Sequence, residues 1–198
     1  MFGDPIDNPK QWDCCKLCDI GTLKNGMNFD KKNSGYKIKF LGVGNFKNGI
    51  LIDNENKLDE IYLTNSPNED YLLKNNDIVF VRSNGSKELV GRTTLIKNMN
   101  VEITFSGFCI RFRNKSQKLN EIYLINLFNI PSYFINLKKN NRGANINNIN
   151  QQMLSRLIIP IPPIELQNKF AQIVEQIDKQ KFVNMNLSQI IGKMSILC

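Results

Sequence analysis

Residues 143–180 read GANINNINQQMLSRLIIPIPPIELQNKFAQIVEQIDKQ, and this stretch decides the fold. An asparagine-rich run leads into an apolar cluster around Leu157, and a bridge with three prolines, residues 160–163, follows. The chain then contains no proline or glycine until Gly192. Proline fixes φ and is tolerated in the first turn of a helix. Pro163 therefore predicts the start of a long, uninterrupted helix.

Apolar side chains recur along this helix at alternating four- and three-residue steps, as at the a and d positions of a heptad repeat. A helix that ran to the C-terminus would be roughly 50 Å long at 1.5 Å per residue, too long for one small domain to cover. We therefore predict a coiled-coil helix that binds a partner, with Gln180 and Asn184 as polar members of the stripe. The predicted contact residues are Leu166, Phe170, Ile173, Ile177, Gln180, Asn184, Leu187 and Ile191.

Charge divides the chain into two parts. The 198 residues carry a formal net charge of +8, with 41% hydrophobic residues, which is ordinary for a folded domain. From Pro160 onward, four lysines against three carboxylates leave +1, so +7 belongs to the first part. This asymmetry favours a polyanion partner for the first part and a protein partner for the helix. A basic protein without a polyanion partner is the alternative.

The sequence also indicates a compartment. No run approaches the roughly 18 apolar residues of a membrane span, and no basic-then-apolar signal pattern begins the chain. We expect a cytoplasmic protein with reduced thiols. Cys15 and Cys18 form a C-x-x-C pair, but the chain has no histidine and no second such pair to complete a zinc site. We therefore expect no bound metal.

The part before the helix has the pattern of a mixed α/β domain. Alternating apolar residues predict strands, and an apolar stretch interrupted by Pro131 predicts helices. We expect a globular domain over residues 1–158, with an extended lead-in anchored by Trp12, and a helical segment over residues 159–198. The predicted strands are residues 36–41, 50–52, 77–82, 89–96 and 102–112, and the predicted helical stretch is 119–137.

Three loops at the ends of these elements are rich in side chains that bind DNA. Arginine pairs with guanine, asparagine or glutamine with adenine, and lysine with phosphate. A solvated surface charge is the alternative for any single residue. As a set, we predict that the loops contact one groove of double-stranded DNA. The candidate residues are Arg82, Ser83, Asn84, Lys87, Arg92, Arg113, Lys115, Lys138, Lys139 and Arg142.

Catalytic patterns are weak. The absence of histidine excludes Ser-His-Asp and Cys-His sites. Residues 40–44, FLGVG, are superficially similar to the glycine loop that binds S-adenosylmethionine, but NFKNG follows and favours a turn over a helix start. Glu55 and Lys57 have the spacing of a metal-dependent nuclease, in polar surroundings that lack flanking strands. We predict no catalytic residue in this chain.

The junction residues carry a resemblance to a known family. The run from Asn145 through Leu157 to IPPIELQ at 161–167, followed by FAQIV at 170–174, resembles type I restriction-modification specificity subunits. There it marks the end of a target recognition domain and the start of the conserved spacer helix. The opening residues 1–12 and the strand at 77–82 are also similar. The chain resembles a half-length subunit with one recognition domain and one spacer helix.

The resemblance implies a function without chemistry in this chain. Such subunits read a bipartite DNA site and dock adenine methyltransferase subunits, which use S-adenosylmethionine, and a restriction subunit, which uses ATP and Mg²⁺. A chain with one recognition domain implies a homodimer paired through its helices. Two alternatives remain open: a metal-dependent nuclease with a coiled-coil tail, and a coiled-coil adaptor that does not bind DNA.

Overall fold

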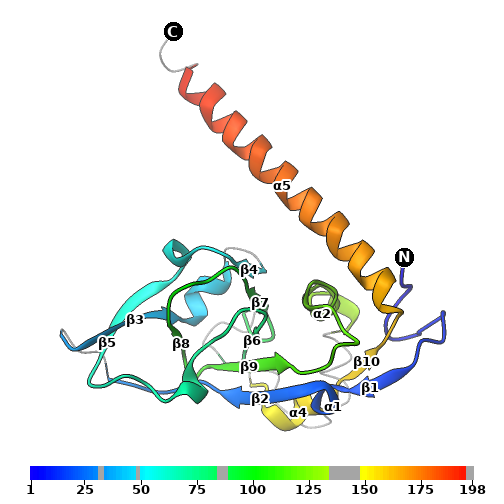
Figure 1. The fold of residues 1–198 in the computed structure, drawn as a ribbon, viewed down its shortest axis with the longest axis horizontal. Coiled ribbons are helices and arrows are strands. Elements are labelled where there is room, and N and C mark those ends of the chain that lie inside the picture. Colours follow the sequence, from blue (N-terminus) through cyan, green and yellow to red (C-terminus); the bar gives the residue numbers. More distant parts are fainter. Residues whose placement is uncertain (31–33, 48–49, 84–88, 134–147, 195–198) are drawn as a thin grey trace.

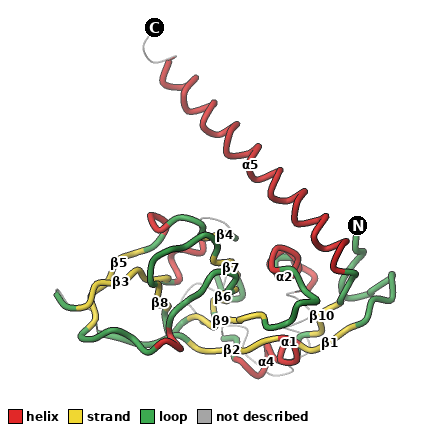
Figure 2. Tube along the Cα trace, in the orientation of Figure 1, coloured by secondary structure: helices red, strands yellow, loops and turns green. Residues whose placement is uncertain are grey.

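The computed structural model describes residues 1–30, 34–47, 50–83, 89–133 and 148–194. In the last helix, the side chains of Phe182 and of residues 185–194 are outside this description. The described chain forms a mixed α/β domain from which one long helix projects (Figures 1 and 2).

A five-stranded sheet forms the centre of the domain. Its order is β2 (Gly21–Asn25), β9 (Cys109–Asn114), β6 (Ile78–Val81), β7 (Thr93–Ile96) and β4 (Leu51–Ile52). The first four strands run antiparallel to their neighbours, whereas β4 pairs with β7 in parallel. All four residues of β6 are buried, as expected for a central strand covered on both faces.

Two smaller sheets complete the strand pairing. The three-stranded sheet has the order β5 (Asp59–Leu63), β3 (Tyr36–Leu41) and β8 (Ile103–Phe105). The other sheet pairs β1 (Cys14–Lys16) with β10 (Ile158–Pro160), so the last strand before the long helix binds the start of the chain. The short helices are α1 (Leu17–Ile20), α2 (Glu121–Phe128) and α4 (Gln151–Ser155), and the 3₁₀ turns are Val43–Lys47, Glu55–Lys57 and Glu69–Tyr71.

Two layers of the core lie against the five-stranded sheet, one on each face. Alternate residues of a strand point to opposite faces. Ile78 and Phe80 of β6 pack in one cluster with apolar residues of α1, α2 and α4. Val79 and Val81 pack in the other, with Ile103 and Phe105 of β8 and Leu41 of β3. The helices therefore cover one face of the sheet, and the three-stranded sheet covers the other.

One predicted strand matches the structure in its bounds, and two others differ from it. The strand predicted at 36–41 is confirmed as β3. The single strand predicted at 102–112 is wrong, because a turn at 106–108 divides it into β8 and β9. In that turn the Cys109 N–H donates to Ser106 O at 2.8 Å. The strand predicted at 89–96 is shorter, because Gly91 has a φ of 88° and forms a turn before β7.

The long helix α5 (Ile164–Met194) begins one residue after Pro163 and extends 31 residues (Figure 1). Gln167 fixes its base. Its amide Nε2 donates to Lys118 O at 2.9 Å and to Pro162 O at 2.7 Å, and its Oε1 accepts from the Asn120 N–H at 2.9 Å. The side chain is fully buried. One amide thus joins the first turn of α5 to the segment that starts α2.

The helix base makes further contacts with its own domain. Phe170 packs edge-on against Phe2, with ring centroids 5.3 Å apart, and Ala171 is buried. Glu175 forms an ion pair with Lys97, which follows β7. Phe170 was predicted to contact a partner, and part of its side chain packs within the domain instead. Farther along, Ile173 and Ile177 are 39% and 48% exposed.

Among the described residues, no helix combines the length and the apolar character that a membrane crossing requires.

Replacing Gln167 with alanine tests how the helix is held. The change removes three hydrogen bonds and leaves two carbonyl groups and one N–H without this partner. We expect a loss of roughly 2–4 kcal/mol in the free energy of unfolding, measured by urea denaturation. The control is Gln172→Ala, at an exposed glutamine of the same helix. A loss at Gln167 no larger than that at Gln172 would show that the amide does not hold the junction.

Candidate nucleic-acid interface

Three segments meet where β6 ends. The Arg82 N–H donates to Phe108 O at 2.8 Å, and Arg82 O accepts from the Ile149 N–H at 2.8 Å. Ser83 and Asn148 form an isolated antiparallel bridge. The end of β6, the turn before β9 and the residues that precede α4 are therefore joined by backbone hydrogen bonds.

The side chain of Asn148 positions Arg82. Arg82 Nε donates to Asn148 Oδ1 at 3.4 Å, and Arg82 is half-buried. The contact brings the two side chains together at the end of the strand. The asparagine-rich run that contains Asn148 stood out in the sequence, but this residue was not among the predicted contacts. Composition alone did not indicate which asparagine of the run would meet Arg82.

Arg92 lies at the same end of the sheet. Its carbonyl accepts from the Val81 N–H at 2.9 Å, and the Gly91 N–H donates to Val81 O at the same distance. The Arg92 side chain is exposed. The structure thus brings together three of the predicted residues, Arg82, Ser83 and Arg92, at the end of the sheet where β6 finishes.

Five of the predicted residues lie outside the described part of the chain: Asn84, Lys87, Lys138, Lys139 and Arg142. The described residues that flank them are informative. Residues 84–88 come directly after Ser83, and residues 134–147 come directly before Asn148. Ser83 and Asn148, the described residues next to these two segments, form a bridge at the end of β6. Their five side chains remain predicted contacts.

Arg113 requires a correction. Its Nε and Nη2 donate to the two carboxylate oxygens of Asp77, both at 2.7 Å, and Nη2 also donates to Leu72 O. The Asp77 side chain is 1% exposed. These hydrogen bonds to Asp77 raise the pKa of Arg113, so the guanidinium stays charged and paired. Arg113 is a structural residue that neutralises a buried carboxylate, and we remove it from the candidate interface.

Lys115 is exposed but lies at the other end of the sheet. Strand β9 separates it from Phe108, and seven residues of extended chain span about 24 Å. The Lys115 N–H donates to Ile20 O, beside β2. The structure therefore does not place the loop around 111–115 beside the loop that follows Arg82. The candidate interface is the Arg82 end of the sheet.

The residues that the sequence singled out for metal binding and for catalysis lie in separate elements of the described chain. Among the described residues, no three histidine, cysteine or carboxylate side chains come together to hold a metal ion. Glu55 and Lys57 lie on a 3₁₀ turn, where Lys57 forms an ion pair with Asp53. Cys14 and Cys18 are exposed, and burial is the largest cause that raises the pKa of Cys15.

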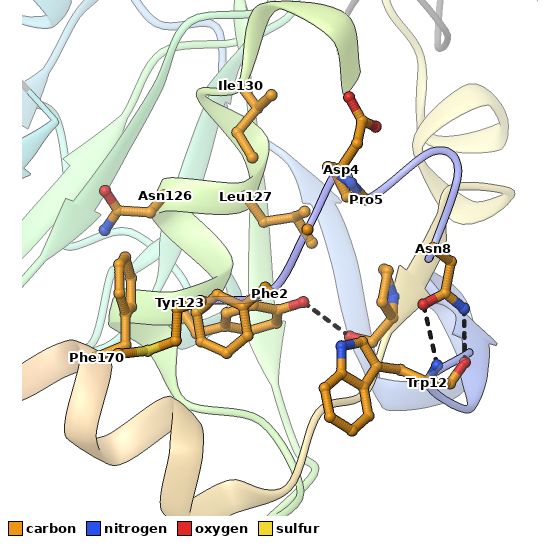
Figure 3. A pocket seen from close by; sticks show the side chains of 13 residues that line it. Phe2, Asp4, Pro5, Asn8, Trp12, Tyr123, Asn126, Leu127, Ile130 and Phe170 are labelled. Atoms are coloured by element: carbon orange, nitrogen blue, oxygen red, sulfur yellow. Dashed lines mark hydrogen bonds between the residues drawn. The ribbon is translucent and has the colours of Figure 1, made fainter. Parts of the chain in front are cut away.

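A pocket of about 510 Å³ lies between the start of the chain, α2 and the base of α5 (Figure 3). Phe2, Tyr123 and Phe170 line it together, and the Tyr123 hydroxyl donates to Pro160 O at 3.1 Å. Asn8 forms two hydrogen bonds with the backbone of Trp12, which also lines the pocket. The start of the chain thus packs against the base of α5. The residues that line the pocket include none from the Arg82 end of β6.

The architecture is that of a basic α/β domain with arginine and asparagine side chains at one end of its central sheet, followed by a projecting helix. A family model agrees with this description. The chain belongs to the type I restriction modification DNA specificity domain family, whose model matches residues 9–190.

Individual relatives show the same relationship. The chain is 32% identical over 159 residues to the type I restriction enzyme StySPI specificity subunit of Salmonella potsdam, covering 77% of this chain and 33% of that protein. It is 27% identical over 196 residues to the EcoKI specificity subunit of Escherichia coli strain K12, covering 93% and 41%. The chain therefore spans about two fifths or less of the length of these relatives.

A solved structure shares the fold. The HsdS subunit of Thermoanaerobacter tengcongensis superimposes with a TM-score of 0.55 over 87% of this chain and 38% of that chain, at 19% sequence identity. The predicted mixed α/β fold and the predicted family are confirmed. That the helix forms a coiled coil remains a prediction.

Proposed function

We propose that this chain reads one half of a bipartite DNA site on behalf of a type I restriction-modification assembly. The observation that carries the proposal is the Arg82–Asn148 pair at the end of β6. An arginine held by a neighbouring side chain can pair with guanine without a large loss of conformational freedom. Ser83 and Arg92 lie at the same end of the sheet and add hydrogen-bond donors.

Charge supports the same surface. The net charge of +8 lies almost entirely before Pro160. Lys87, Lys138, Lys139 and Arg142 contribute to this charge, and Ser83 and Asn148, which flank their segments in sequence, form a bridge beside Arg82. Lysine and arginine that neutralise phosphates supply affinity independent of sequence, and the side chains at the end of β6 supply the discrimination.

The remaining functions follow from the family. We propose that adenine methyltransferase subunits, with S-adenosylmethionine, dock on this chain, and that a restriction subunit using ATP and Mg²⁺ joins them. The chain itself supplies no catalytic residue in this proposal. We expect the assembly to work in the cytoplasm, on cellular DNA.

The exposed part of α5 suggests how this recognition domain is paired with a second one. Ile173 and Ile177 lie one turn apart on α5 and are 39% and 48% exposed, so they form one apolar face that the domain leaves uncovered. We propose that a second copy covers this face, which pairs two recognition domains about a two-fold axis. Gln180 Nε2 donates to Asn184 Oδ1 at 3.2 Å within the helix, so the two side chains form one polar site in the middle of the proposed seam.

DNA binding is tested by salt dependence. Alanine at Lys138, Lys139 and Arg142 together should weaken binding to all duplexes. It should also lower the slope of log K against log salt, by about 0.9 for each phosphate that the variant no longer neutralises. The measurement is fluorescence anisotropy with a labelled duplex at several salt concentrations.

The matched control replaces Lys169, Lys179 and Lys181 on the helix with alanine, which removes the same charge. This control should leave the slope near that of the unmutated chain. Equal slopes in all three proteins would remove the 138–142 loop from the interface, and an absence of salt-dependent binding in the unmutated chain would overturn the proposed function.

The second copy is tested by mass in solution. Ile173→Asp with Ile177→Asp places two carboxylates in the proposed seam, so we expect the mass to fall from about twice 22.8 kDa to 22.8 kDa while the circular dichroism of the domain is retained. Light scattering at high micromolar concentration measures the mass. Gln172→Asp with Gln176→Asp adds the same charge one position earlier and should stay dimeric. A monomeric unmutated chain would contradict the homodimer.

A further inference from the structure

The turn between β8 and β9 presents an aromatic side chain to solvent. Phe108 is 58% exposed, whereas Phe105 and Phe112 in the adjoining strands are fully buried. The prediction of one strand over residues 102–112 did not single out Phe108. A large aromatic ring exposed beside an arginine is available to contact a binding partner.

The turn is held in one conformation. The Phe108 N–H donates to Ser106 Oγ at 3.2 Å, and the Gly107 N–H donates to Met27 O at 2.9 Å. A Cβ at Gly107 would lie 2.1 Å from Asn28 Oδ1, so no larger residue fits without movement. The ring therefore projects from a rigid support, and binding costs little conformational freedom.

The pairing of β6 with β9 places this ring beside the candidate base-reading residue. Val81 pairs with Cys109, and the next hydrogen bond runs from the Arg82 N–H to Phe108 O at 2.8 Å. Phe108 is thus the cross-strand neighbour of Arg82, and side chains in such positions lie within reach of the same small target. The Ser83 N–H also points to Phe108 O, at 3.4 Å.

We propose that Phe108 packs against the 5-methyl group of a thymine in the major groove, within the half-site that Arg82 contacts. The inference rests on the proposed DNA-reading function and assigns a further specificity-determining residue to it. The thymine methyl is the apolar group that base edges display in the major groove, and phenylalanine is one of the side chains that contact it.

Contact with a methyl group leaves the base pairs stacked, whereas a side chain that wedges a base step open costs a few kcal/mol of unstacking per step. At 58% exposure, about two fifths of Phe108 is covered by its own domain. The ring therefore offers part of its surface to a neighbour, which suits contact with a methyl group. The adjacent Arg82 supplies the hydrogen bonds that the methyl contact lacks.

The first measurement finds the thymine. The full chain selects sequences from a pool of random duplexes, and the enriched half-site is compared with those of Phe108→Ala and Phe108→Leu. We expect Phe108→Ala to lose its preference at one T·A pair, and Phe108→Leu, which keeps an apolar contact, to retain it. Val101→Ala is the control, because Val101 is 38% exposed and precedes β8 instead of lying in the turn. Thermal unfolding checks that each variant is folded.

The second measurement removes only the methyl group. Deoxyuridine in place of that thymine should weaken binding by the unmutated chain on the order of fivefold, the effect of exposing roughly one buried methyl group. Phe108→Ala should bind the thymine duplex and the deoxyuridine duplex with equal affinity.

The outcomes separate the two proposals. An unmutated chain that enriches no sequence overturns the proposed function and this inference with it. A defined half-site that contains no thymine sensitive to deoxyuridine overturns the inference and leaves the function standing. Sensitivity that persists in Phe108→Ala assigns the methyl contact to another residue and also overturns the inference.

Discussion

The buried amide of Gln167 is the interaction on which the arrangement of the molecule depends. Three backbone groups from two segments converge on it, at 2.7 to 2.9 Å. A buried amide without these partners would be unfavourable by roughly 1–3 kcal/mol, so the helix base and the loop before α2 are folded as one unit. The direction in which α5 leaves the domain is fixed there, at the base of the helix. Any partner on the helix is thereby given a defined position relative to the domain.

Much of this framework could be predicted from local sequence. Pro163 marked the start of α5 to within one residue, and strict alternation marked β3 at 36–41. Both signals are local, because φ restriction and side-chain period act within a few residues. The division of 102–112 into two strands could not be seen this way. It depends on the Gly107–Met27 hydrogen bond and the close approach of Asn28, which only the fold brings about.

The candidate site shows the same division. Arg82, Ser83 and Arg92 were predicted as DNA contacts because charge gathers at the end of a predicted strand, and they remain predicted contacts that share one end of the sheet. Arg113 was misassigned for a physical reason: its charge balances the buried carboxylate of Asp77, 36 residues away in sequence. Asn148 was missed because the bridge to Ser83 joins residues far apart in the chain. Basic composition indicates a polyanion partner, but strand register decides which basic residues share a surface.

We propose that the Arg82 end of the sheet reads DNA sequence for a partner methyltransferase. The most direct measurement is a genome-wide map of adenine methylation in cells that express this chain with that methyltransferase, compared with cells that express Arg82→Ala. We expect a defined bipartite motif for the unmutated chain and a changed or relaxed base preference in the half-site for the variant. Methylation that falls evenly at every site, with no change of motif, would contradict a reading role for Arg82. It would leave this end of the sheet only a positioning role on the DNA backbone.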